Sequence, residues 1–300
     1  MKIKEEQHNV YLYGIRDFDI EQILECGQCF HFKKIAEKEY GISAHGRLLH
    51  VKQEVCEETS SLVLYNCDLE EYNAVWEHYF DLNRDYGAIK KELLLRDNKL
   101  KEAMDVMWGI RILNQEFFET MISFIISQNK QIPHIKQIVE NISIKYGKYL
   151  GTIGKEEFYS FPDVNTLKEV TEEEWRMLKV GFRAPYIVDA IQKILSGEIA
   201  ENVLMLMNRE DAMKELMKVK GIGEKVANCI LLFSLGKRDA FPVDVWMKRI
   251  MEYLYFHEET DNQVIRKRAI GMYGEYGGYA QQYLFYYGKV HNLGKTGKNG

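Results

Sequence analysis

The spacing of apolar residues changes near residue 68, and this change constrains the fold more than any other feature of the chain. Before it, apolar and polar residues alternate along short segments, which is typical of β-strands with one buried face. These segments are 10–15, 29–35, 40–55 with a turn at His45-Gly46, and 61–67. From residue 69 on, apolar residues recur every three or four positions, which is typical of amphipathic helices.

The expected helices fill most of the chain after residue 68. They are 69–106, 116–128, 133–146, 164–179, 183–196, 209–218, 224–235, 245–255, 262–275 and 278–290. Strands and helices in separate stretches predict an α+β fold. We expect an N-terminal antiparallel, β-rich domain over 1–108, an all-helical core over 109–294 and a flexible tail over 295–300.

The composition excludes several classes of protein. Of the 300 residues, 46% are apolar and 28% are charged, as in ordinary globular chains. No run approaches the roughly 18 apolar residues of a membrane span, and the first ten residues lack the apolar core of a secretory signal. The net charge of −5 argues against nucleic-acid binding by charge alone, but it allows binding through backbone amides and a local basic patch.

The five cysteines favour a reducing compartment, because their number is odd and small for this length. Cys26 and Cys29 have the spacing of a redox pair or of half a zinc site, which is the minor alternative here. A zinc site lacks its second local pair, because Cys56 and Cys67 are 11 residues apart and Cys229 stands alone. We therefore expect no metal and no redox cofactor.

A Gly221-Ile222-Gly223 turn between two helical runs is the first chemically informative segment. The glycines permit positive φ angles and the close approach of a foreign backbone. The first backbone amides of the second helix have no partner within the helix, and they suit a phosphate. Lys225 lies in the first turn of that helix, where its amine is a candidate nucleophile beside a bound sugar-phosphate.

Asp244 follows Lys225 by 19 residues. By itself, Asp244 reads as the N-cap of the next helix, and Lys225 by itself reads as a solvated lysine. Together, at this spacing after a Gly-x-Gly turn, they favour a catalytic pair.

Four other segments complete a recognisable set: 26–30, 123–132, 181–186 and 278–285. Together with the two helical runs and the Gly221-Ile222-Gly223 turn between them, which form a helical hairpin, these segments resemble the helix-hairpin-helix DNA glycosylases. Within that family they resemble the 8-oxoguanine DNA glycosylase/AP lyases. The resemblance runs in the family's order from about residue 10 to residue 288. It implies that an antiparallel N-terminal domain joins a helical glycosylase core, that Lys225 forms a Schiff base and that Asp244 is the essential carboxylate.

The resemblance also assigns residues to the lesion base. The carbonyl of Gly27 would accept a hydrogen bond from N7–H of the oxidised guanine. Cys229 and Phe285 would sandwich the base, and Gln281 would bind its Watson–Crick edge. Without the resemblance, Gln281 and Phe285, at positions i and i+4, read as a core-facing pair.

A third group would contact the DNA around the extruded base. Asn129, which alone also fits a helix C-cap, would fill the gap. Phe182 would wedge the opposite strand, and Arg183 would read the base opposite the lesion. With the hairpin glycines, the expected DNA-binding residues are Asn129, His134, Phe182, Arg183, Gly221, Gly223 and Trp246.

Three of these positions depart from the family's pattern. His134 stands where the better-known members have an arginine, Phe182 replaces a tyrosine, and Trp246 replaces a phosphate-contacting histidine. We expect the lesion pocket and the lyase chemistry to survive these changes, and the reading of the opposite base to be altered.

The implied activity is bifunctional: the enzyme would flip 8-oxoguanine out of duplex DNA, excise it and cleave the strand by β-elimination. Its partner would be double-stranded DNA containing oxidised guanine. We expect a monomer with no cofactor and no membrane contact, in the cytoplasm or, in a eukaryote, the nucleus.

Two alternatives remain. A monofunctional relative acting on another damaged base would lack Lys225, and a non-catalytic DNA-binding hairpin protein would need neither Lys225 nor Asp244.

Overall fold

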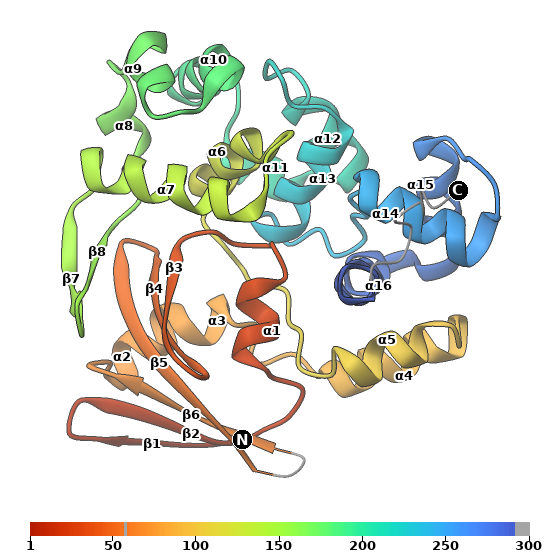
Figure 1. Ribbon diagram of the computed structural model, residues 1–300, viewed down its shortest axis with the longest axis horizontal. Coiled ribbons are helices and arrows are strands. Elements are labelled where there is room, and N and C mark those ends of the chain that lie inside the picture. Colours follow the sequence, from red (N-terminus) through yellow and green to blue (C-terminus); the bar gives the residue numbers. More distant parts are fainter. Residues whose placement is uncertain (57–58, 292–300) are drawn as a thin grey trace, which may run out of the picture.

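The computed structural model describes residues 1–56 and 59–291, and its N-terminal part is a six-stranded antiparallel sheet (Figure 1). The strand order is β1-β2-β6-β5-β4-β3. The strands are β1 (Lys2–Glu6), β2 (Asn9–Ile15), β3 (Phe32–Ala36), β4 (Glu39–Ala44), β5 (Arg47–Cys56) and β6 (Thr59–Tyr65). Most of the remaining chain is helical, which confirms the expected α+β fold. The expected tail, 295–300, lies outside the described residues.

Side chains along strands such as β6 are alternately buried and partly exposed, which explains why these segments form a sheet with one face on the core. In β6, Leu62 and Leu64 are fully buried while their neighbours Val63 and Tyr65 are partly exposed. β4 and β5 form the expected hairpin, and its turn residues, His45-Gly46, have φ angles of 52° and 66°. Two consecutive positive φ angles match the twist of the flanking strands, so this turn fixes the register of the hairpin.

The helical part packs beside the sheet. Its helices, with short π and 3-10 segments (η), are α2 (Leu69–Glu71), η1 (Tyr72–Trp76), α3 (Glu77–Tyr79), α4 (Tyr86–Arg96), α5 (Leu100–Val106), α6 (Phe117–Ser127), α7 (Ile132–Tyr146), α8 (Val164–Leu167), α9 (Glu172–Met177), η2 (Gly181–Arg183), α10 (Ala184–Leu195), α11 (Glu201–Leu206), α12 (Arg209–Leu216), α13 (Glu224–Phe233), α14 (Val245–Met251), η3 (Glu252–Phe256), α15 (Asn262–Tyr273), η4 (Gly274–Tyr276) and α16 (Gly277–Val290). None of the described helices combines the length and the apolarity that crossing a membrane requires.

Two of the expected long helices, 69–106 and 164–179, are divided in the structure. Asp85 begins α4 by accepting a hydrogen bond from the Ala88 amide. Thr171 begins α9 with a capping box, in which its side chain and that of Glu174 each bond the other's backbone amide. A capped start interrupts a helix even where the apolar period continues through it.

Several elements lie outside the segments that the sequence predicts: β1, α1 (Ile20–Glu25), α11, and a hairpin of β7 (Tyr149–Ile153) and β8 (Glu156–Tyr159). All five side chains of β1 are exposed, so its sequence carries no apolar alternation. The β7–β8 hairpin lies among helices but packs on the main sheet. A Cβ on Gly41 would lie 2.2 Å from Cζ of Phe158, so this close contact requires glycine.

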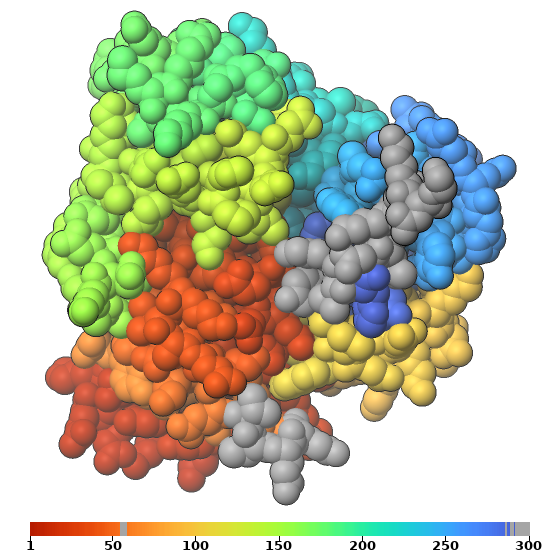
Figure 2. Space-filling model, viewed as in Figure 1, coloured from red at the N-terminus to blue at the C-terminus, as the bar shows by residue number. Residues whose placement is uncertain are grey.

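The sheet and the helices have separate cores, and a buried arginine contacts residues of both. Arg111 is 4% exposed, and its guanidinium donates hydrogen bonds to the carbonyl oxygens of Arg16, Asp17 and Asp81 at 2.9, 2.8 and 2.7 Å. It also lies 4.4 Å from the ring centre of Tyr86, at the start of α4. The space-filling view shows the red N-terminal segments directly against the yellow-green region that contains α7 (Figure 2).

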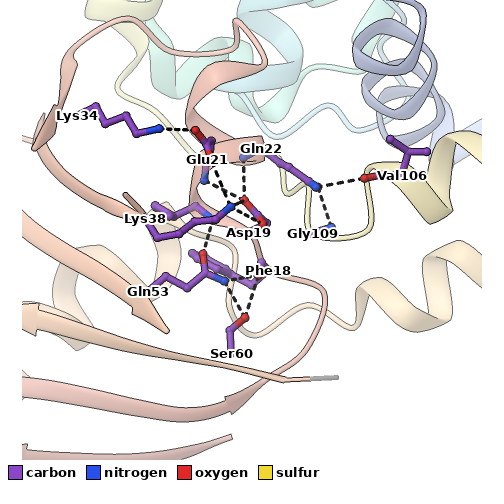
Figure 3. A network of polar contacts seen from close by, with 11 residues as sticks. Phe18, Asp19, Glu21, Gln22, Lys34, Lys38, Gln53, Ser60, Val106 and Gly109 are labelled. Atoms are coloured by element: carbon purple, nitrogen blue, oxygen red, sulfur yellow. Dashed lines mark hydrogen bonds and ion pairs between the residues drawn. The ribbon is translucent and has the colours of Figure 1, made fainter. Parts of the chain in front are cut away.

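A polar network fixes the start of α1, the helix that leads into the predicted Gly27 element (Figure 3). The Asp19 carboxylate caps α1 and accepts two hydrogen bonds from Lys38 at 2.8 Å. The Asp19 amide donates to the carbonyl of Gly109, whose own amide donates to Gln22. A Cβ on Gly109 would lie 2.4 Å from the Asp19 nitrogen, so glycine is required there. The network ties α1 to the segment that enters the helical part.

Candidate active site

A cavity of about 420 Å³ lies where the end of α1 meets α6, α7, α13, α14 and α16. It is lined by both predicted catalytic residues and by all four predicted base-binding residues. The lining residues that the following paragraphs use are Gly27, Phe124, Ser127, Lys225, Cys229, Asp244, Trp246, Gln281, Gln282 and Phe285. Segments more than 250 residues apart in the sequence therefore meet at this cavity.

The hairpin between α12 and α13 uses its two glycines differently. Gly221 has a φ angle of +77°, and a Cβ there would lie 2.2 Å from the ring of Tyr186. Gly223 is exposed, has a φ angle of −93°, and has no atom within 4 Å of an added Cβ. Of the positive φ that both glycines permit, only Gly221 therefore makes use. The lack of a side chain at Gly223 leaves open space at the start of α13.

Lys225 lies in the first turn of α13, and its side chain contacts α6. Its Nζ is 3.4 Å from Oγ of Ser127 and 5.3 Å from the ring centre of Phe124. One turn later, Cys229 is 3% exposed, and burial raises the pKa of its thiol to about 11. The thiol is therefore neutral at physiological pH, which suits a contact with the face of a base.

Asp244 both caps a helix and lines the cavity. Its Oδ1 accepts a hydrogen bond of 2.8 Å from the Met247 amide at the start of α14. The side chain is only partly buried, and it borders both the cavity and a neighbouring groove. The simple capping interpretation of Asp244 is thus compatible with a role beside a substrate.

Gly27 is held by its neighbour Gln28, to which the sequence analysis gave no role. The Gln28 amide nitrogen donates to the carbonyls of Ile23 and Arg111 at 2.8 and 2.7 Å, and its oxygen accepts from the Leu113 amide. Gly27 itself has a φ angle of +90°. A buried glutamine with three backbone partners therefore fixes the turn that carries the Gly27 carbonyl, in a backbone conformation that favours glycine.

α16 contributes Gln281, Gln282 and Phe285 to the cavity. Gln281 and Gln282 are 5% and 4% exposed, and Nε2 of Gln282 donates a hydrogen bond of 2.7 Å to Oε1 of Gln281. Phe285 is partly buried beside them. Gln282 lines the cavity although the sequence pattern assigned it no role.

A groove of about 490 Å³ adjoins the cavity and shares Lys225, Asp244 and Trp246 with it. Asn129 and Gly223 also line this groove. Asn129 is exposed with a φ angle of +51°, in the turn between α6 and α7. Asparagine tolerates this left-handed conformation better than most residues.

The other predicted DNA-binding residues lie outside both spaces. His134 is exposed near the start of α7, and Phe182 is 53% exposed. Arg183 is 3% exposed, because its guanidinium lies 4.2 Å from the ring centre of Phe182 and donates to the Val180 carbonyl at 3.0 Å. Arg183 would have to leave this position to contact a base.

No metal site is evident in the part of the chain that the structure describes, which contains no group of three or more potential metal-ligating side chains. Cys26 and Cys29 are buried and form no disulfide there. Burial raises the pKa of Cys29 well above its usual value, so Cys29 is a poor metal ligand or nucleophile.

Family models cover most of the chain. Residues 10–121 match the N-terminal domain of 8-oxoguanine DNA glycosylase, and residues 122–271 match the HhH-GPD superfamily of base excision DNA repair proteins. The chain belongs to this glycosylase superfamily.

Relatives of the family are similar over most of the chain. A probable N-glycosylase/DNA lyase of Methanothermobacter thermautotrophicus is 32% identical over 229 residues, covering 70% of this chain and 72% of the relative. The N-glycosylase/DNA lyase OGG1 of Arabidopsis thaliana is 28% identical, covering 86% and 74%. The structure of an 8-oxoguanine glycosylase/lyase of Clostridium acetobutylicum, bound to DNA with cytosine opposite 8-oxoguanine, has a TM-score of 0.92 and 40% identity, covering 98% and 99%.

Proposed function

We propose that this protein is a bifunctional DNA glycosylase/AP lyase that excises 8-oxoguanine from double-stranded DNA. The observation that carries the proposal is that Lys225 and Asp244 line the same cavity as Gly27, Gln281 and Phe285. A non-catalytic DNA-binding protein has no need for an amine and a carboxylate at such a cavity. A monofunctional glycosylase has no need for the amine.

The cavity is large enough to hold an extruded base, and its walls suit a purine. Flipping the nucleotide costs a few kcal/mol, which phosphate contacts and the side chains that fill the gap offset. Gly223 would receive a phosphate at the start of α13, and Asn129 would enter the gap. Phe285 and the Cys229 thiol would hold the two faces of the base.

Gly27 would distinguish the lesion from guanine. 8-Oxoguanine carries a proton on N7, whereas N7 of guanine is a hydrogen-bond acceptor. A carbonyl at Gly27 therefore attracts the lesion and repels the normal base. Gln28 would contribute by preventing this turn from relaxing away from the base.

Lys225 would then attack C1′ as the bond to the base breaks, and the base leaves with the bonding electron pair. Asp244 would stabilise the positive charge that develops on the sugar. The C1′–O4′ bond then breaks, a proton released by Nζ passes to O4′, and the opened sugar carries an iminium between Nζ and C1′. Removal of the C2′ proton and departure of the 3′ phosphate then cleave the strand. These steps need no metal or redox cofactor.

We propose the expected division at residue 108 between the two domains, and a monomer that acts on duplex DNA without membrane contact. Such an enzyme works where the DNA lies, in the cytoplasm or, in a eukaryotic cell, the nucleus. His134, Phe182 and Trp246 would contact DNA around the lesion.

His134 stands where better-known members of the family have an arginine, and this difference should change the enzyme's preference for the base opposite the lesion. A neutral histidine offers one donor and one acceptor, whereas an arginine reads cytosine with a rigid fork. Arg183 is buried against Phe182, so reading cytosine first requires breaking its contacts. We expect a modest preference for cytosine, which His134→Arg increases in single-turnover excision opposite each of the four bases. A steep preference that His134→Arg leaves unchanged would contradict this role.

The test of function is excision from a labelled duplex with one 8-oxoguanine, analysed with and without alkali. We expect cleaved strands without alkali, and none from an undamaged duplex. Cleavage only after alkali would indicate a monofunctional glycosylase. Excision of 3-methyladenine in place of 8-oxoguanine would assign the chain to the alkylated-base branch of the superfamily.

A further inference from the structure

Two adjacent glutamines on α16 are hydrogen-bonded to each other at the cavity. Gln281 and Gln282 both line it, and both are at least 95% buried. The Gln282 Nε2 atom donates to Oε1 of Gln281 at 2.7 Å. The Gln282 Oε1 atom is buried and has no hydrogen-bond partner among the described residues.

This contact fixes which way the amide of Gln281 faces. A glutamine amide has an acceptor oxygen on one side and a donor NH₂ on the other. Because the Gln282 nitrogen only donates, turning the Gln281 amide by 180° alone would place NH₂ against NH₂. The hydrogen bond is therefore lost when Gln281 turns.

Turning both amides together is also unfavourable. It would move the NH₂ group of Gln282 to the buried position now held by its unpartnered oxygen. Orphaned buried N–H donors are rarer in proteins than undersatisfied carbonyl oxygens. The observed arrangement thus sets the absolute orientation of Gln281.

The orientation of this amide matters because purines differ in polarity along their Watson–Crick edge. Guanine has an acceptor at O6 and a donor at N1–H, whereas adenine has a donor at N6 and an acceptor at N1. A side-chain amide that makes two hydrogen bonds to one of these edges must turn by 180° to match the other. A freely turning glutamine therefore accepts both edges, and a fixed one accepts only one.

We propose that Gln282 is a positioning residue that holds Gln281 for 6-oxopurines and thereby excludes 6-aminopurines. This inference rests on the proposed function, in which Gln281 meets the Watson–Crick edge of the extruded base. It also explains why a glutamine occupies this buried position. An unpartnered buried carbonyl lowers stability, and an apolar side chain there would avoid this cost.

The experiment compares excision of 8-oxoguanine and of 8-oxoadenine, each placed opposite the same base in the same duplex. The ratio of the two single-turnover rates is measured for the wild type and for Gln282→Met, which has similar volume and no donor. We expect the ratio to fall about tenfold in the variant, the size of one specific hydrogen-bonding contact. Both rates come from one preparation, so a lower folded fraction cancels in the ratio.

Gln192→Met, an exposed position on α10, is the matched control and should leave the ratio unchanged. A second variant, Gln282→Ala, should lower the ratio in the same direction. A ratio unchanged in both Gln282 variants, with both rates reduced equally, would show that Gln282 only supports packing and would overturn the inference. A wild-type chain that does not excise 8-oxoguanine would instead overturn the proposed function.

Discussion

At the scale of single residues, the carboxylate of Asp244 caps a helix and also lies where it can act on a bound substrate. One oxygen accepts the Met247 amide at the start of α14, while the side chain borders the cavity that contains Lys225. A helix start supplies a fixed place for a carboxylate without any further supporting contact. The same geometry therefore fits the capping role and the catalytic role, and a substitution is needed to separate them.

Asp244→Asn separates the two roles, because an amide oxygen still accepts the Met247 hydrogen bond while the negative charge is lost. We expect the melting temperature to change little and the excision rate to fall about 100-fold or more, as when a group that stabilises transition-state charge is removed. Thermal denaturation and single-turnover excision on the same preparation measure both effects. An excision rate close to that of the wild type would mean that Asp244 only caps α14.

At the scale of elements, the two glycines of the α12–α13 hairpin are needed for different reasons. Gly221 needs its positive φ and the absence of a side chain against Tyr186, whereas Gly223 needs neither within the protein. The sequence pattern Gly-x-Gly predicts the hairpin but does not show this division. Only the packing of α10 beside the turn reveals that Gly221 is structural.

Gly221→Ala and Gly223→Ala form a matched pair that tests this division. Gly221→Ala should destabilise the fold by at least about 1 kcal/mol, because alanine is strained at positive φ and its Cβ meets Tyr186. Gly223→Ala should leave stability nearly unchanged and weaken binding to duplex DNA, because its methyl group occupies the open space at the start of α13. Urea denaturation and DNA titration measure the two quantities. Equal stability losses, or unchanged DNA affinity in Gly223→Ala, would contradict the assignment.

The sequence predicts elements best where apolar periodicity and turn residues agree, as at the His45-Gly46 hairpin. It fails where burial comes from distant segments: β8 is a strand because Phe158 packs on Gly41. The site shows the same limit. Lys225 and Asp244 follow from a local pattern, whereas Gln282 escapes it, because adjacent helix residues do not generally share a face.

At the scale of the whole molecule, the cavity depends on how the sheet and the helices are held together. Gly27 comes from the end of α1, and Lys225, Asp244 and Gln281 come from the helical part. Arg111 connects the two through three backbone carbonyls. The relative position of the lesion-reading turn and the catalytic lysine therefore rests on contacts outside the cavity.

Arg111→Met should destabilise the protein by about 3 kcal/mol, because it leaves buried carbonyls without their charged donor. If Arg111 joins the two parts, lesion selectivity should also fall as the Gly27 turn loses its fixed place. Urea denaturation gives the stability, and excision from 8-oxoguanine and undamaged duplexes gives the selectivity. A variant with wild-type stability would show that Arg111 is not the connection.

In the proposed mechanism Lys225 is the amine that attacks the sugar, and borohydride trapping detects the covalent product of that attack. Borohydride reduces an iminium to a stable amine and so links the enzyme covalently to the DNA. We predict a trapped complex between the wild type and an 8-oxoguanine duplex, and no trapped complex with Lys225→Gln. The control variant is Lys155→Gln, at an exposed position in the β7–β8 turn, and it should be trapped as efficiently as the wild type. Trapping by Lys225→Gln at the wild-type level would contradict this role of Lys225, because the nucleophile would then be another amine.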